Sequence, residues 1–272
     1  MNEIKNRGWS VTMAGLGINL ALGILYTWSI FKQAIKESVM AKDGVFNWDM
    51  ASLNDPFAVC CLMFTVAMVF AGRIQDKFSP RMTAIIGGIL TGAGLIVISQ
   101  SNALSAWILG FGVLTGLGLG FGYASATPPA IKWFPSSKTG LIAGIVVAGF
   151  GLASVYIAPL ANFLIARFGL SQSMLIFGVA FLAVVCILSM FLVNPPAEYV
   201  AAGAVPSANT TAAPATDFSP SQMLKTGAFY KLWFMYFIGA GAALIIIGGV
   251  AGMAKQSMGD LAWLVVALMA VG

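Results

Sequence analysis

The chain has 272 residues, of which 59% are hydrophobic and only 8% are charged, and its formal net charge is +5. Globular domains are about half apolar and about a quarter charged, so this composition excludes an ordinary globular domain and indicates a multi-pass membrane protein. The chain has no histidine, no nucleophile motif and no pair of carboxylates in the middle of an apolar run. An enzyme is therefore not expected, and neither is a metal site or a cofactor.

The apolar runs predict the number of membrane spans. A helix needs roughly 20 apolar residues to cross about 30 Å of hydrocarbon. Seven runs are long enough, at residues 9–31, 51–71, 82–99, 103–127, 139–165, 173–193 and 229–253. An eighth run begins at Leu261 and continues to Gly272, which gives only about 18 Å of helix, so we expect the chain to be truncated inside a membrane segment.

Lys and Arg in the loops predict the orientation, because cytoplasmic loops carry an excess of them. With a cytoplasmic N-terminus, the inside segments hold nine such residues: Lys5, Arg7, Arg73, Lys77, Arg81, Lys132, Lys138, Lys225 and Lys231. The outside segments then hold five: Lys32, Lys36, Lys42, Arg167 and Lys255. We therefore expect a cytoplasmic N-terminus in a cell inner membrane. The positive net charge indicates topology, and no nucleic-acid partner is expected.

The first apolar run carries one polar amide. Asn19, Gly23, Tyr26 and Ile30 follow one another at steps of three or four residues, so they share one helix face. An amide inside a membrane span faces either a neighbouring helix or a cavity. An interhelical hydrogen bond and a role in a binding site are both open for Asn19.

Glycine and proline mark the fourth and fifth runs. The fourth run contains six glycines, whose spacing favours close approach of neighbouring helices: Gly110, Gly112, Gly116, Gly118, Gly120 and Gly122. Pro128 and Pro129 are expected to stop or kink that helix. The fifth run is interrupted by Gly149-Phe150-Gly151, and irregular helix at membrane depth is tolerated where it lines a cavity or is buried in protein.

The composition divides the chain into three parts. Residues 1–193 are expected to form an N-terminal six-helix bundle. Residues 194–228 are rich in Ala, Pro, Ser and Thr, which predicts a cytoplasmic linker. The linker ends in the capping pattern Ser219-Pro220-Ser221-Gln222, which predicts a short surface helix. Residues 229–272 are expected to begin a C-terminal bundle with helix 7 and an incomplete helix 8.

The segment between the second and third runs resembles the loop between helices 2 and 3 of major facilitator superfamily transporters. Gly72, Asp76, Lys77 and Arg81 stand at the positions of that pattern, whereas Ser79 replaces its usual glycine. The resemblance implies an all-α membrane protein with that superfamily's fold. It also implies that Asp76 pairs with nearby cations and meets a helix N-terminus of the other bundle, as a conformational latch; alternatively, the basic residues only set the topology.

Several further motifs are similar to the oxalate/formate antiporter family of small-carboxylate transporters. They are Leu22-Gly23-Ile24-Leu25-Tyr26-Thr27-Trp28-Ser29, Gly120-Phe121-Gly122-Tyr123, Lys132-Trp133-Phe134-Pro135, Ala148-Gly149-Phe150-Gly151-Leu152, Met223-Leu224-Lys225-Thr226 and Phe229-Tyr230. The likeness extends over nearly the whole chain.

That resemblance implies a carboxylate pocket walled by aromatic residues. Tyr26 and Tyr123 match pocket tyrosines, Phe150 stands where the oxalate carrier has a tyrosine, and Asn19 is a further candidate for substrate binding. Core packing is the alternative for each aromatic residue. A rise of about 1.5 Å per residue places Tyr123 and Phe150 at mid-membrane and Tyr26 nearer the outside.

Every Lys and Arg falls in a predicted loop or at a helix end, so no cation is expected at mid-depth to neutralise a carboxylate. An unpaired anion there would be very costly. In the family, an Arg on the eighth helix and a Lys on the eleventh supply the charge. The resemblance thus implies that this chain holds the aromatic half of the site.

The expected function is secondary active transport of small carboxylates, of the oxalate/formate or pyruvate/lactate kind, by alternating access with a site between bundles at the midplane. A membrane sensor or assembly subunit with the same fold, which does not transport, is the alternative. The expected partners are a small organic anion, the lipid bilayer, and a proton or counter-substrate. A full-length monomer is expected.

Overall fold

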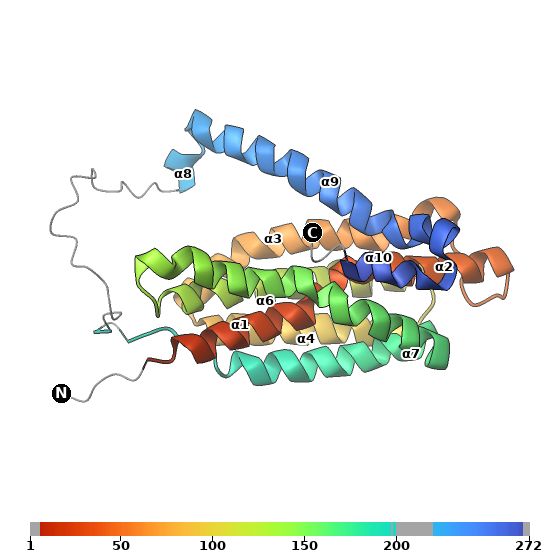
Figure 1. The fold of residues 1–272 in the computed structure, drawn as a ribbon, viewed down its shortest axis with the longest axis horizontal. Coiled ribbons are helices and arrows are strands. Elements are labelled where there is room, and N and C mark those ends of the chain that lie inside the picture. Colours follow the sequence, from red (N-terminus) through yellow and green to blue (C-terminus); the bar gives the residue numbers. More distant parts are fainter. Residues whose placement is uncertain (1–5, 197, 200–219, 269–272) are drawn as a thin grey trace.

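The fold was analysed in a computed structural model, which describes residues 6–196, 198–199 and 220–268. These residues form helices and turns, with no strand among them. Long helices lie roughly side by side in a bundle, and the last long helix crosses its side (Figure 1). In the described part of the chain, six helical segments are long and apolar enough to cross a membrane.

The first span consists of three consecutive helical sections. They are α1 (Gly8–Leu22), the 3-10 helix η1 (Gly23–Thr27) and α2 (Trp28–Ala41). The apolar run was expected to end at Phe31 and to be followed by an outside loop with a little helix, whereas the helix continues through Ala41. Phe31 and Ile35 are buried on one face of α2. The Lys, Gln and Glu residues around them in the sequence are good helix formers.

The second, third and fourth spans extend from η2 to α6. They are η2 (Met50–Asn54) with α3 (Asp55–Lys77), α4 (Pro80–Ser99), and α5 (Leu104–Trp107) with the π-helix η3 (Ile108–Thr115) and α6 (Gly116–Ile131). Of the two expectations for Pro128 and Pro129, the stop was wrong, because both lie inside α6, which continues through Ile131, whereas the kink stays a prediction. Neighbouring membrane helices let a span tolerate the lost backbone hydrogen bonds.

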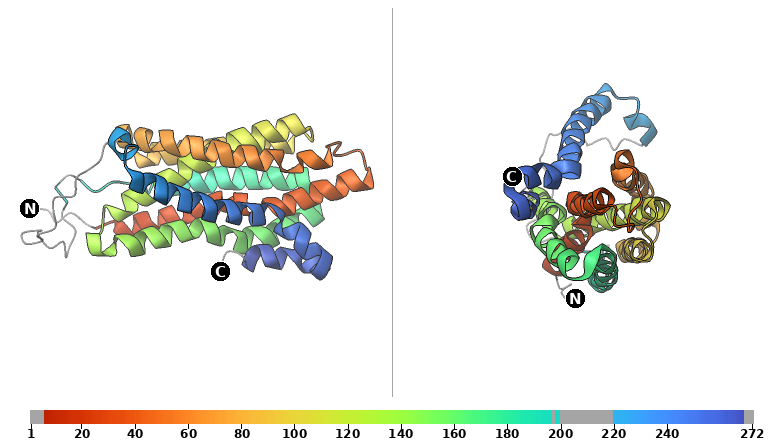
Figure 2. Two further views of the ribbon diagram at one scale, coloured as in Figure 1. Left: turned by 90° about the horizontal axis from the view of Figure 1, so that it is seen from above. Right: turned by 90° about the vertical axis from the view of Figure 1, so that its right-hand side faces the viewer.

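The fifth and sixth expected spans are joined without a loop. After η4 (Ser136–Lys138), helix α7 (Thr139–Ser189) contains a reversal at Gly169, whose φ of 79° and ψ of 170° are not helical. This backbone region is essentially restricted to glycine. The chain turns back at this point, so α7 consists of two antiparallel membrane-length halves (Figures 1 and 2).

The remaining helices lie on one side of the bundle, where the later part of α9 and α10 pack against it while α8 and the start of α9 stand away from it (Figures 1 and 2). They are α8 (Pro220–Met223), α9 (Gly227–Met258), η5 (Gly259–Leu261) and α10 (Ala262–Leu268). Helix α10 contacts α7, and α9 contacts α2 (Figure 2). Most of the expected linker, residues 197 and 200–219, and the final residues 269–272 lie outside the described part of the chain.

Glycine lets the central helices approach closely, as expected. A Cβ atom added to Gly118 of α6 would lie 2.3 Å from Thr91 Oγ1 and 2.6 Å from the Gly87 carbonyl oxygen, both on α4. A Cβ on Gly116 would lie 2.6 Å from the Cys60 carbonyl oxygen on α3. Helix α6 is therefore held between α3 and α4 at distances that exclude a side chain, which confirms the prediction of tight packing.

We predict that Gly118→Ala destabilises the protein by about 1–3 kcal/mol, because the added methyl group would meet backbone atoms that cannot move independently. Thermal unfolding in detergent measures the effect. Gly144→Ala is the matched control, since a Cβ there has nothing within 4 Å, and it should be neutral or stabilising by up to about 1 kcal/mol. Equal unfolding temperatures for the two variants would contradict close packing of α6.

Candidate functional site

An aromatic cavity opens on one face of the bundle. Its volume is ≈ 420 Å³, and its walls come from η1, α6 and the first half of α7. The lining residues are Tyr26, Tyr123, Val147, Ala148, Phe150, Gly151 and Leu152. None of these described lining residues is charged. The cavity is thus suited to a small ligand held by aromatic and hydroxyl groups.

Phe150 is the centre of the aromatic cluster at this cavity. Its ring centroid lies 5.3 Å from that of Tyr26, 5.1 Å from that of Tyr123 and 5.9 Å from that of Phe64. The first two pairs meet edge to face, which is a favoured aromatic geometry. Four separate spans therefore contribute a ring, and the three aromatic residues predicted from the sequence come together.

Gly23 allows η1 to reach this cluster. A Cβ atom on Gly23 would lie 2.3 Å from the Phe150 carbonyl oxygen and 2.2 Å from the Ala153 Cβ atom. The absence of a side chain brings the first span and α7 into backbone contact, directly beside Tyr26. The expectation that Tyr26 lies nearer the outside was wrong. The ring of Tyr26 lies 5.3 Å from that of Phe150, so the two residues lie at a similar level of the bundle.

The hydroxyl groups of Tyr26 and Tyr123 make no hydrogen bond to any residue that the structure describes. Two other tyrosines do: Tyr156 donates to the Leu20 carbonyl at 2.9 Å, and Tyr199 donates to the Trp133 carbonyl at 3.2 Å. A half-buried tyrosine hydroxyl usually finds a partner. Tyr26 and Tyr123 therefore present two available donors at the cavity.

Helix α9 adds a third tyrosine. Tyr236 lies near both Tyr26 and Tyr123, although its own side chain is 80% exposed. It lies on α9, which contacts η1. Sequence reasoning missed Tyr236, because it lies among several aromatic residues at the start of α9, and missed Phe64, because nothing marks it within its apolar run.

Asn19 does not line the aromatic cavity. Its side chain is fully buried, and its Nδ2 donates to the Val146 carbonyl of α7 at 2.8 Å. Its Oδ1 atom is buried without a hydrogen-bond partner among the described residues. Of the two roles left open by the sequence, the interhelical hydrogen bond is the one that the geometry provides.

The predicted latch residues lie at the end of the bundle where α1 begins. The expected loop was too long, since α3 runs through Lys77 and only Phe78 and Ser79 separate it from α4. Ser79 has an extended backbone, with φ of −171°, and its Oγ accepts from the Met82 amide at 3.1 Å. The replacement of glycine therefore costs the turn nothing, because the serine caps α4.

The structure does not give Asp76 its expected partners. Asp76 is exposed on α3, and no ion pair joins it to another described residue. Arg81 Nη2 instead donates to the Met190 carbonyl at 2.8 Å. The Lys77 ammonium lies over the ring of Phe78. A Cβ atom on Gly72 would meet nothing within 4 Å. These four residues share one end of the molecule without forming a cluster.

Comparison with known proteins places this architecture in a family. The family model described as Major Facilitator Superfamily matches residues 8–272. The D-xylose-proton symporter has a similar fold, with a TM-score of 0.55 over 97% of this chain and 66% of its own, at 13% sequence identity. The predicted all-α fold of this superfamily is thereby confirmed.

Curated relatives agree with the resemblance found in the motifs. The uncharacterized MFS-type transporter YhjX of Escherichia coli is 25% identical over 93% of this chain and 59% of its own length. The oxalate:formate antiporter of Oxalobacter formigenes is 25% identical over 91% of this chain and 56% of its own. Bovine monocarboxylate transporter 1 is 30% identical over 63% of this chain and 33% of its own length. The chain thus spans a little over half the length of the first two relatives.

These relatives are transporters, and the helical segments between residues 8 and 258 are long and apolar enough to cross a membrane repeatedly. The family match covers both the aromatic cavity and helices α8 to α10. The chain is a multi-pass membrane protein that belongs to the Major Facilitator Superfamily of transporters.

Proposed function

We propose that this chain forms the N-terminal bundle and the beginning of the C-terminal bundle of a secondary transporter for small carboxylates, which works by alternating access. The observation that carries the proposal is the pair of available tyrosine hydroxyls, Tyr26 and Tyr123, on the wall of an aromatic cavity. The names of the relatives, an oxalate:formate antiporter and monocarboxylate transporters, support the same substrate class.

The cavity suits a carboxylate in two respects. Phenol hydroxyls donate to carboxylate oxygens, and each hydrogen bond to a charged group contributes about 1.5–3 kcal/mol. The positive edges of the aromatic rings add weaker attraction to an anion. Phe150 supplies a ring edge without a hydroxyl, which leaves room for a monocarboxylate such as pyruvate or lactate as well as for oxalate or formate.

The countercharge must come from outside this cavity, since none of its described lining residues is a cation. An anion that leaves water without a countercharge would incur a penalty that two hydroxyls cannot offset. Within the proposal, residues 1–193 form the first bundle, residues 194–228 the linker and residues 229–272 the start of a second bundle that completes the site. The N-terminus is cytoplasmic, the membrane is a cell inner membrane, and a proton or counter-substrate moves with the substrate through a monomer.

Asp76 is proposed to act in the conformational cycle. It lies exposed on the last turn of α3, beside Lys77, at the end of the bundle where a second bundle would close against the first. Attraction between this carboxylate and a helix N-terminus is worth about 0.3–2 kcal/mol. That is enough to shift a two-state equilibrium between outward-facing and inward-facing forms.

The carrier that contains this chain, reconstituted in liposomes, is expected to take up at least one of labelled oxalate, formate, pyruvate and lactate. The 272-residue chain alone should give no uptake, because its aromatic cavity lacks the countercharge. Binding without uptake by the carrier would favour the alternative of a sensor, and robust uptake by the 272-residue chain would refute the division of the site between two bundles.

We expect Tyr26→Phe and Tyr123→Phe each to weaken substrate affinity about tenfold or more, since each removes one hydrogen bond to the carboxylate. Equilibrium binding of the transported acid measures the effect. Tyr230→Phe is the matched control, because Tyr230 is an exposed tyrosine on α9 whose ring contacts Phe229. Unchanged affinity in both cavity variants would rule out carboxylate binding by these hydroxyls.

Asp76→Asn should slow transport far more than it weakens substrate binding, because the carboxylate acts on the equilibrium between conformations and lies away from the cavity. Uptake rate and equilibrium affinity, measured on one preparation, separate the two effects. Asp49→Asn, at an exposed position before η2, is the control and should change neither. An equal loss of rate and affinity in Asp76→Asn would count against the latch.

A further inference from the structure

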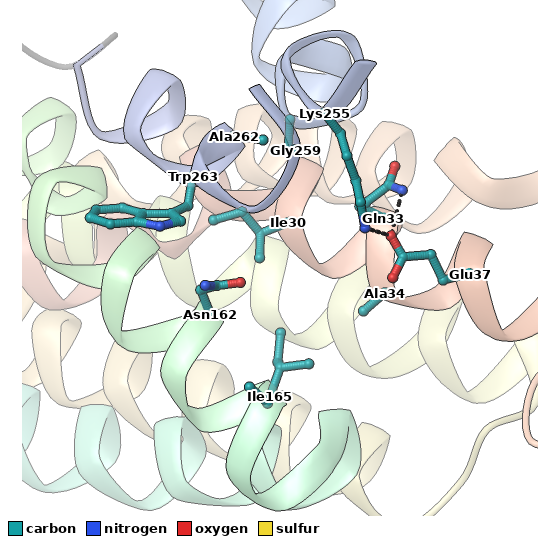
Figure 3. A pocket seen from close by; sticks show the side chains of 12 residues that line it. Ile30, Gln33, Ala34, Glu37, Asn162, Ile165, Lys255, Gly259, Ala262 and Trp263 are labelled. Atoms are coloured by element: carbon teal, nitrogen blue, oxygen red, sulfur yellow. Dashed lines mark hydrogen bonds and ion pairs between the residues drawn. The ribbon is translucent and has the colours of Figure 1, made fainter. Parts of the chain in front are cut away.

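A second cavity, of ≈ 470 Å³, lies between α2, the first half of α7 and the helices α9 and α10 (Figure 3). Unlike the aromatic cavity, it is lined by charged and amide side chains, among them Gln33, Glu37, Asn162 and Lys255. Trp263 of α10 completes its wall. Lys255 was expected in a loop, but it lies within α9 and reaches this cavity.

Lys255 is held by a partner that can be displaced. Its Nζ forms an ion pair with Glu37 Oε1, and Gln33 Nε2 donates to the same oxygen at 2.7 Å. The side chains of Lys255 and Glu37 are 40% and 49% exposed. Ion pairs this open to solvent contribute little to stability. The displacement of Glu37 from Lys255 by a second anion therefore costs little.

Two further donors line the cavity without a protein partner. Neither the Asn162 amide nor the Trp263 indole N–H makes a hydrogen bond to any residue within the described ranges. In Figure 3 the Asn162 amide extends into the space between the Trp263 ring and the ion pair. Together with the Lys255 ammonium, these groups offer a cation and two uncharged donors, which is the complement of a carboxylate.

The same two segments of the chain wall both cavities. Gln33 follows Tyr26 by about 10 Å of helix, and Asn162 follows Phe150 by about 18 Å. The second cavity therefore lies farther along the same seam between the first span and α7, toward the end where α9 terminates at Met258. A ligand that moves along this seam would meet the charged cavity at one end and the aromatic cavity in the middle.

We propose that the second cavity is a separate binding site for a small carboxylate on its way to or from the aromatic cavity. The incoming carboxylate displaces Glu37 from Lys255 and accepts hydrogen bonds from Asn162 and Trp263. Glu37, which is half exposed, then returns to water. This site rests on the proposed transport function and extends it, because it supplies from α9 a cation that the aromatic cavity lacks.

Counting carboxylate sites tests the proposal. The carrier that contains this chain is placed in phosphatidylcholine nanodiscs, and the binding of labelled pyruvate is followed to saturation. We expect two sites in the unaltered protein and one in Lys255→Met. Glu37→Gln removes the competing carboxylate and should tighten the second site by no more than about fivefold. Asn162→Leu should weaken it, and Lys231→Met, elsewhere on α9, should change nothing.

Several results would overturn this site. If Lys255→Met still binds carboxylate at two sites, or if Glu37→Gln binds carboxylate more weakly at the second site, then the ion pair only links α2 to α9 and does not mark a binding site. Thermal unfolding of each variant shows whether it is folded, so that lost binding can be told from lost folding. Lys255→Arg keeps the positive charge and should keep both sites. Tighter binding of methyl phosphate than of pyruvate would assign the cavity to lipid headgroups. If the unaltered carrier has a single carboxylate site and Lys255→Met leaves that site intact, the second cavity is not a binding site and the proposed function stands. If the unaltered carrier binds no carboxylate, the proposed function is refuted as well.

Discussion

Backbone contact between the first span and α7 at Gly23 determines the arrangement of the functional region. Only a residue without a side chain can lie so close to the Phe150 carbonyl, since a Cβ atom would be 2.3 Å from it. The contact occurs where the first span tightens into a 3-10 helix, and this tightening sets Tyr26 against Phe150. The Asn19 to Val146 hydrogen bond reinforces the same seam one turn away. Both cavities open along it.

The two cavities differ in charge, and the difference agrees with the physics of moving an anion into a membrane. Desolvation without a countercharge is costly, so a cavity with aromatic and hydroxyl walls cannot hold a carboxylate unaided. Lys255 lies near the end of α9, and its partner Glu37 is half exposed. A cation at a solvated position can receive an anion before the anion loses its water. Under the proposed function, the aromatic cavity then requires a countercharge from residues outside its described lining.

Much of the fold follows from simple sequence features. Length and hydropathy predicted the spans, because a bilayer requires about 20 apolar residues for each crossing. The glycine spacing of the fourth run predicted the close approach of α6 to its neighbours. Only a little helix was expected after Phe31, because Lys and Glu residues there indicated a loop, whereas the first span extends to Ala41. In the structure, Phe31 and Ile35 hold the helix to the bundle while its charged residues occupy the other faces.

The site was predictable only in part. Family motifs predicted Tyr26, Tyr123 and Phe150 as site residues, and in the structure the Phe150 ring contacts the rings of both tyrosines. Phe64 and Tyr236 could not be found in this way, because an aromatic residue in a uniformly apolar run carries no local sign of which face points inward. The role of Lys255 depends on a contact with a residue far away in the chain, Glu37, and no local pattern encodes such a pair.

The central claim is that a carboxylate binds against the tyrosines of the aromatic cavity. Solid-state NMR of the carrier that contains this chain, with ring-labelled tyrosine and a ¹³C-labelled carboxylate, measures the proximity directly. The account predicts dipolar contacts between the carboxylate carbon and the rings of Tyr26 and Tyr123. A bound carboxylate without contact to either ring would contradict it.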